Sequence, residues 1–128
     1  MAGIIRAGHT VFPISPRNSA PAVAHLLTKT GTQHVFVGIE SALQDLAATS
    51  LKLMKGAGTP LPTLQDIPLF ETLYSKSLDE SYEPIPKFKP DWNDPAVIMH
   101  SSGSTAFPKP IVWSHYRYFL LGIVPCKH

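Results

Sequence analysis

The chain has 128 residues, of which 44% are hydrophobic and 16% charged, and its formal net charge is +2 at pH 7. This length suits one modest hydrophobic core, and the apolar content excludes a disordered chain. Basic residues are spread along the chain, so it lacks the basic stripe that is typical of a nucleic-acid binder. The 13 prolines exclude a coiled coil or a helical bundle.

Cysteine content and hydropathy indicate the compartment. Cys126 is the only cysteine, so no disulfide can form within the chain and a secreted disulfide scaffold is excluded. The apolar run at residues 119–124 is far shorter than the roughly 20 residues needed to span a bilayer. Residues 1–8 lack the apolar centre of a signal peptide. We therefore expect a cytoplasmic protein that neither enters a membrane nor binds nucleic acid.

The chain opens with a strand signal followed by a helix signal. Residues 10–15 predict a short strand. Asn18 or Ser19 is expected to cap a helix that has Pro21 in its first turn, where proline is tolerated. Gly31 is expected to end this helix, since glycine readily adopts the left-handed conformation found there.

A second strand and a second helix follow. Residues 34–38 are β-branched and aromatic, which predicts a buried parallel strand. A helix is expected from about residue 41 to residue 55. Its apolar side is predicted to consist of Leu43, Leu46, Ala47, Leu53 and Met54. Alternating strands and helices indicate βαβ units with a parallel sheet.

Proline dominates the stretch from residue 59 to residue 95, which holds seven of them. We expect a connecting segment there, with a helical turn only at residues 69–74. Regular structure is predicted to return after it as a strand at 96–100, a strand at 111–113, and a helix at 115–122 that Ser114 caps. The predicted fold class is α/β: a partial three-layer fragment with a short, mostly parallel sheet flanked by helices.

A polar loop follows the strand at 96–100 and carries the most chemical information. Residues 101–105 are three serines, a glycine and a threonine, and Lys109 stands four residues further on. Hydroxyls and free backbone N–H groups can surround phosphate oxygens, and glycine allows the backbone to come close. The lysine supplies a positive charge. A plain polar turn between two strands explains the same composition, and the residues alone leave both interpretations open.

Two familiar loop motifs do not fit this stretch. A Walker-type loop needs a second glycine and a Ser/Thr after its lysine, but Pro108 and Pro110 occupy those positions. Proline has no N–H to offer a phosphate. A hydrolase nucleophile elbow needs two glycines around a serine, and only Gly103 is present.

Two longer motifs resemble the adenylate-forming (AMP-binding) enzyme superfamily. Residues 101–115, SSGSTAFPKPIVWSH, are similar to its phosphate loop, with Ala106 where most members have glycine. That variant is typical of the fungal nonribosomal-peptide-synthetase-like and aminoadipate-reductase-like adenylation domains. Residues 6–16, RAGHTVFPISP, resemble an earlier core motif of the same superfamily. Both motifs occur in the expected order.

The resemblance implies a reaction and a set of residues. Members of this superfamily use ATP and Mg²⁺ to convert a carboxylic acid into an acyl-adenylate, with release of pyrophosphate. Thr105 would also lie near Mg²⁺, and no catalytic residue is assigned. The residues implied to hold the ATP phosphates are Ser101, Ser102, Gly103, Ser104, Thr105 and Lys109.

The resemblance also implies that residues 1–128 are a partial adenylation domain, within which residues 59–95 are the proline-rich connection. The later aromatic-Gly-x-Thr-Glu motif and the small domain with its catalytic lysine have no counterpart. We therefore expect a ligase fragment that is inactive alone. The alternatives are a weak ATP or polyphosphate binder and a non-catalytic partner of a full-length relative. Exposed sheet edges would then allow self-association.

The histidines and aromatics near the loop receive plainer interpretations. His100 and His115 are expected to be structural, at a strand end and a helix start. The spacing of His115, Cys126 and His128 fits no common zinc site. The aromatic residues after the loop are expected to lie in the core or at a domain interface; they are Trp113, Tyr116, Tyr118 and Phe119.

Overall fold

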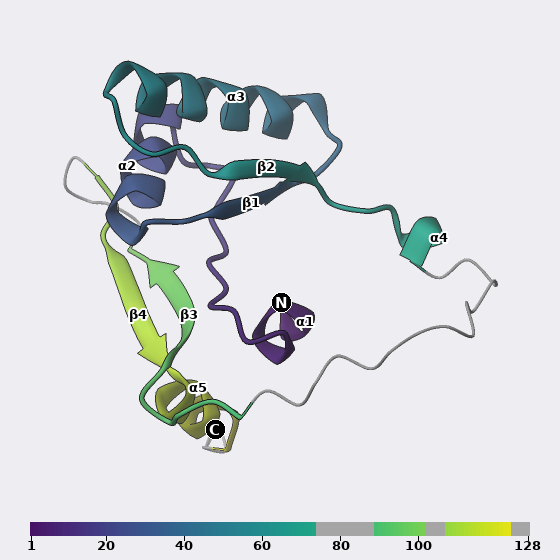
Figure 1. Ribbon diagram of the computed structural model, residues 1–128, viewed down its shortest axis with the longest axis vertical. Coiled ribbons are helices and arrows are strands. Elements are labelled where there is room, and N and C mark those ends of the chain that lie inside the picture. Colours follow the sequence, from purple (N-terminus) through teal and green to yellow (C-terminus); the bar gives the residue numbers. More distant parts are fainter. Residues whose placement is uncertain (74–88, 102–106, 124–128) are drawn as a thin grey trace. The chain divides into compact units, whose positions relative to one another are not determined.

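The computed structural model describes residues 1–73, 89–101 and 107–123 (Figure 1). The chain forms two compact units. The first comprises Met1–Ile14, Pro84–Ser104 and Pro108–His128, and the second comprises Ser15–Glu83 and Thr105–Phe107. Both contain helices together with short strands, which confirms the α/β class.

Two helices dominate the second unit. Helix α2 spans Ala20–Thr30, and Gly31 ends it with a φ of 60°, in the left-handed region. Ser19 takes the N-cap position without a side-chain cap bond, and the proline lies in the first turn as predicted. Helix α3 spans Ser41–Gly56. Both predicted helices are therefore confirmed.

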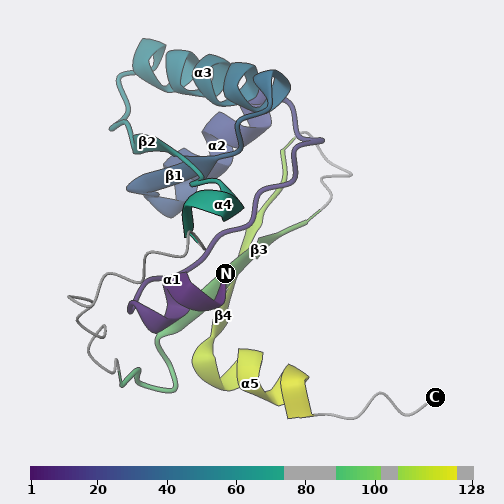
Figure 2. The same ribbon diagram turned by 90° about the vertical axis from the view of Figure 1, so that its right-hand side faces the viewer.

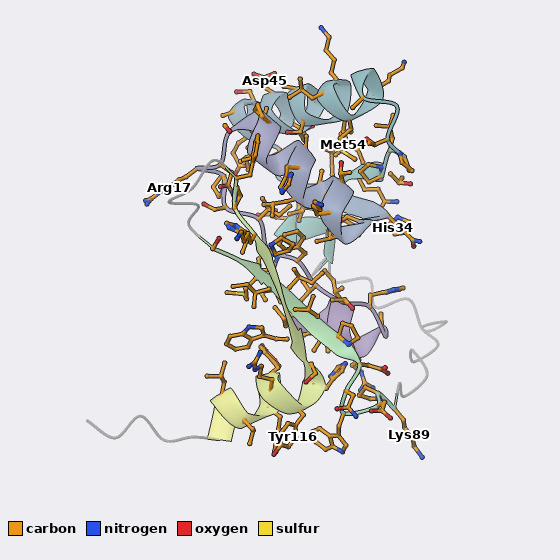
Figure 3. All side chains as sticks on the ribbon, turned by 90° about the vertical axis from the view of Figure 1, so that its left-hand side faces the viewer. Arg17, His34, Asp45, Met54, Lys89 and Tyr116 are labelled. Atoms are coloured by element: carbon orange, nitrogen blue, oxygen red, sulfur yellow. The ribbon has the colours of Figure 1, made fainter. Side chains whose placement is uncertain are left out.

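Helices α2 and α3 pack against each other, and each contributes buried side chains to this unit. Leu26 of α2 is fully buried and Met54 of α3 is 3% exposed. Figure 3 shows Met54 on the side of α3 nearest α2, with Asp45 on its opposite side.

The apolar side predicted for α3 is wrong at one position. Leu53 is 44% exposed, whereas Ser50 is fully buried. Ser50 and Met54 are one helical turn apart and share a face, while Leu53 is turned about 100° from Met54. The Ser50 hydroxyl donates to the carbonyl oxygen of Leu46 at 2.7 Å, so its burial leaves no polar group unpaired.

A parallel pair of strands accompanies the helices. Strand β1 spans His34–Val37 and strand β2 spans Thr63–Asp66, and helix α3 connects them as a βαβ unit. Within β1, Val37 is buried but Phe36 is 49% exposed. The strand predicted here is therefore confirmed as parallel, but the prediction that it is buried is wrong, because successive side chains point to opposite faces and only one of those faces is covered.

Strand β2 lies in the stretch where the sequence predicts only a connection. Its four residues are all exposed, so no hydrophobic pattern reveals it. Pro62 and Pro68 flank the strand without interrupting the ladder, because the amides next to them make the bonds at its ends. The Thr63 amide donates to Gln33, just before β1, and the Ile67 amide donates to Val37. Helix α4, Phe70–Leu73, confirms the helical turn predicted after it.

The first unit holds an antiparallel pair and a helix. Strand β3 spans Pro95–His100 and strand β4 spans Pro110–Ser114. Helix α5, His115–Ile123, continues directly from β4 (Figure 2). The Arg117 amide donates to the Ser114 hydroxyl at 3.4 Å, which confirms the predicted cap. Helix α1, Ala2–Arg6, precedes them in the chain.

The strand predicted at residues 10–15 is wrong, since only Val11 pairs, in a parallel bridge to Val97. The Val11 amide donates to Ala96 at 3.1 Å and its carbonyl accepts from Ile98 at 2.8 Å. The next donor of a parallel ladder would be residue 13, which is proline. The pairing therefore ends after one residue.

A small core surrounds that bridge. Val11, Ala96 and Val97 are buried together, and Ile4 and Ile5 of α1 pack against them. Val11 of the first family motif thus shares a core with β3, the strand that leads into the second motif.

Candidate functional site

The two ends of the polar loop are joined by backbone pairing in the first unit. The Ser101 amide donates to the carbonyl oxygen of Lys109 at 3.1 Å. The Lys109 amide donates to the hydroxyl oxygen of Ser101 at 3.0 Å. These bonds continue the register in which His100 of β3 faces Pro110 of β4. The loop is therefore a closed connection between two antiparallel strands.

The side chains at this closure remain available for a ligand. The bond from Lys109 uses one lone pair of the Ser101 hydroxyl and leaves its proton free to donate. Lys109 is exposed, and its ammonium group has no ion-pair partner elsewhere in the described part of the chain. Pro108 is buried beside it. The Lys109 ammonium group is thus exposed, while the backbone of Lys109 is held by its pairing with Ser101.

The remaining predicted phosphate-binding residues lie outside the described residues. They are Ser102, Gly103, Ser104 and Thr105. Among the predicted phosphate-binding residues, Ser101 and Lys109 are therefore the two that the structure describes, and it places them in contact.

Sequence reasoning missed a ring contact just beyond the loop. In the second unit, Phe107 stacks with His25 of α2, with ring centroids 5.0 Å apart and an interplanar angle of 20°. The only signal for Phe107 in the sequence is its place inside the loop motif, directly after Ala106. Nothing in the pattern of α2 singles out His25, since ring partners far apart in sequence are decided by tertiary structure.

The histidines of the first unit have structural surroundings, as expected. The Nδ1 atom of His100 lies 3.1 Å from the carbonyl oxygen of Ser101, and its ring meets Phe12 edge-on at 6.2 Å. His115 is the first residue of α5, where its amide donates to the carbonyl oxygen of Asp94 at 3.0 Å.

The aromatic side chains of α5 do not lie in the core, one of the two positions predicted for them. Tyr116, Tyr118 and Phe119 are exposed. Trp92 meets two of these rings edge-on, Tyr116 at 6.4 Å and Phe119 at 5.5 Å. Trp113 of β4 is half-buried. For Tyr116, Tyr118 and Phe119, the predicted position in the core is wrong, and the predicted position at a domain interface stays a prediction.

The described residues fit a phosphate group better than a resident metal ion. Lys109 offers a cation, and the Ser101 hydroxyl offers a donor. No group of three or more His, Cys, Asp or Glu side chains suited to a metal occurs among residues 1–73, 89–101 and 107–123. Mg²⁺ is commonly held by substrate phosphates and only one or two carboxylates. None of the helices found in these ranges combines the length and the hydropathy that a bilayer-spanning helix needs.

Comparison with known proteins identifies the family. The family described as AMP-binding enzyme matches residues 1–127. The chain belongs to the AMP-binding enzyme family. The adenylate-forming reductase Nps10 of Heterobasidion annosum is 43% identical over 128 residues, which are 98% of this chain and 12% of that protein. The chain thus spans a small part of this relative's length.

Two solved structures share the fold over most of this chain. The luciferase-like enzyme of the nonluminescent mealworm Zophobas morio matches with a TM-score of 0.60 and 28% identity, over 88% of this chain and 26% of that one. A fatty acyl CoA synthetase of Mycobacterium tuberculosis matches with a TM-score of 0.52 and 25% identity, over 88% of this chain and 20% of that one.

Proposed function

We propose that this chain carries the phosphate-holding part of an ATP-dependent, acyl-adenylate-forming ligase. The observation that carries the proposal is the pairing of Ser101 with Lys109 at the base of a loop whose sequence matches the family motif. Membership of the AMP-binding family supports it. A strand pair closed in this way holds the loop's two ends at a fixed separation, which favours the binding of a polyphosphate.

In the proposed reaction, a carboxylate oxygen attacks the α-phosphorus of ATP, and the bond between this phosphorus and the pyrophosphate oxygen breaks. Negative charge develops on the departing pyrophosphate. The Lys109 ammonium would neutralise part of that charge, and loop hydroxyls would donate to the phosphate oxygens. The proposed hydroxyl and backbone donors are Ser101, Ser102, Gly103, Ser104 and Thr105, with Thr105 also near the Mg²⁺ that accompanies ATP.

We propose that the 128-residue chain binds ATP weakly and does not complete this reaction alone. It spans only 12% of the length of the fungal reductase that it resembles, and the residues of the later motifs would come from elsewhere. An ATP-consuming reaction also favours a cytoplasmic location, where ATP is made available.

The test measures binding and chemistry separately. Mg·ATP is titrated into the chain, and pyrophosphate release is followed with a panel of carboxylic acids. We expect binding without pyrophosphate release, and weaker binding by Lys109→Ala and Ser104→Ala, with Lys29→Ala of α2 as the control. Unchanged affinity in both loop variants would contradict the phosphate site. Release of pyrophosphate would contradict the inactivity of the isolated chain.

A second candidate is a non-catalytic role through self-association. Strand β4 pairs only with β3 among the described residues, and its Val112 is 52% exposed. An uncharged, apolar edge strand is a template for pairing with another chain. Sedimentation over a range of concentrations would detect such an oligomer. Val112→Lys should return it to a monomer, and an unchanged distribution of species would rule out this edge.

A further inference from the structure

Helix α3 carries two opposite charges along the middle of its exposed face. Asp45 and Lys52 are both exposed and stand seven residues apart, so a turn of about 100° per residue brings them to within about 20° of each other around the helix. Met54, which is buried, lies about 180° around the helix from Asp45. Figure 3 shows Asp45 on the side of α3 away from α2. The two charges therefore lie on the side of the helix opposite to its buried side.

Neither charge is neutralised within the described structure. Ion pairs within a helix join residues three or four apart, and the positions at these distances from Asp45 and Lys52 hold no residue of opposite charge. Neither side chain has an ion-pair partner elsewhere in residues 1–73, 89–101 and 107–123. The helix dipole does not explain their placement, because its effect is confined to the terminal turns and neither residue lies in the first or last turn.

The exposed face of α3 is complementary in charge to a second copy of itself. When two identical helices pack antiparallel around a twofold axis midway between Asp45 and Lys52, each Asp45 lies opposite the Lys52 of the other copy. The residues at that midpoint are Ala48 and Thr49, which are exposed and small enough for the two helices to approach closely. A single match along the helix therefore produces two ion pairs.

Leu53 adds an apolar component to this face. It lies about 80° around the helix from Asp45, at one edge of the charged face, and is 44% exposed. A second helix packed on the face would remove part of this side chain from water, which favours association. The leucine that is absent from the buried side of α3 thus lies where a second copy would cover it.

We infer that two copies of this chain associate through the exposed faces of α3, packed antiparallel and joined by two Asp45–Lys52 ion pairs. This surface is distinct from the free edge of β4, which belongs to the other unit. Exposed ion pairs contribute little each, and stable interfaces bury about 1,200 Å² or more, which a contact between single helices does not reach. The expected dimer is therefore weak, with a dissociation constant of about 0.1–1 mM.

The experiment measures the sedimentation equilibrium of the full chain at concentrations up to about 1 mM, where a weak interface is populated. Asp45→Lys and Lys52→Asp each replace two attractive pairs by two repulsive ones, and each should weaken dimerisation about tenfold or more. The double variant with both substitutions restores opposite charges across the axis and should dimerise within about threefold of the unmodified chain. An equimolar mixture of the two single variants should form a heterodimer, because each supplies the charge that the other lacks.

The matched control is Lys29→Asp of α2, which changes the net charge as Lys52→Asp does but lies on another helix and should leave dimerisation unchanged. Circular dichroism checks that every variant keeps its helices. High salt should weaken the dimer, since it screens exposed charges. A chain that stays monomeric over the whole range, or single variants that dimerise as well as the unmodified chain, would overturn the inference. Dimerisation lost in Val112→Lys and kept in the α3 variants would also overturn it, and would assign the contact to the β4 edge.

Discussion

Ser101 and Lys109 are joined twice, once between their backbones at 3.1 Å and once from the Lys109 amide to the Ser101 hydroxyl at 3.0 Å. The second bond is unusual for a strand pair, because a side-chain oxygen replaces the carbonyl as acceptor. The serine that begins the loop motif is thus also the residue that closes the loop. A substitution of Ser101 that removes its hydroxyl therefore removes the second of these bonds and leaves the positive charge of Lys109 in place.

Ser101→Ala should weaken Mg·ATP binding about two- to tenfold, which corresponds to the loss of one ordinary hydrogen bond. The variant leaves the Lys109 amide without its side-chain acceptor and removes one proposed phosphate donor. Ser101→Thr keeps an oxygen in place and should bind within about twofold of the unmodified chain. Calorimetric titration measures both. Equal affinity for the alanine and threonine variants would show that this hydroxyl does not contribute.

Leu26→Ala should lower the free energy of unfolding by about 2–5 kcal/mol, because it opens a cavity in the buried interior of the second unit. Leu26 is fully buried, whereas Leu53 of α3 is largely exposed. Leu53→Ala is therefore the matched control and should change stability by less than about 1 kcal/mol. Urea unfolding followed by helical circular dichroism gives both values. Similar losses for the two variants would contradict this orientation of the helices.

Substitutions of Ser50 test how tightly the buried face of α3 is packed. Ser50→Ala should change the free energy of unfolding by no more than about 0.5 kcal/mol, because the helix tolerates alanine and the hydroxyl bonds only to Leu46 of its own helix. Ser50→Leu should destabilise by about 1–3 kcal/mol through overpacking. Leucine and alanine both favour helices, so a difference between the variants reports steric crowding. Equal stability of the two variants would show that the space around residue 50 accommodates a leucine side chain, which would contradict tight packing there.

Two helix-end glycines should respond in opposite directions to alanine. Gly31 has a φ of 60°, and an added Cβ would be strained although no atom lies within 4 Å of it. Gly31→Ala should therefore cost about 1 kcal/mol. Gly56, the last residue of α3, has no positive φ and the same open space. Gly56→Ala should stabilise by about 0.5–1 kcal/mol, measured by urea unfolding. Losses of equal size would contradict the left-handed end of α2.

Much of the fold could be predicted because its signals are local. Helix α2 has its proline and its closing glycine within eleven residues of each other, and the alternation of strand and helix leads to the α/β class. Strand β3 and strand β4 are likewise visible as short β-branched runs. The family motifs are contiguous along the chain, which is why the sequence alone is enough to name Ser101 and Lys109 as candidates.

The rest depends on contacts between distant parts of the chain. Strand β2 has no pattern of its own and exists because its amides meet β1. The strand expected at residues 10–15 shrinks to Val11 because Pro13 cannot supply the next bond of the ladder. Burial of Ser50 in place of Leu53, and the stack of His25 on Phe107, follow from how α2 packs. Local sequence determined which helices form and which loop is the candidate phosphate site. Tertiary structure decided which side chains meet, since pairing and burial are set by partners that are distant in sequence.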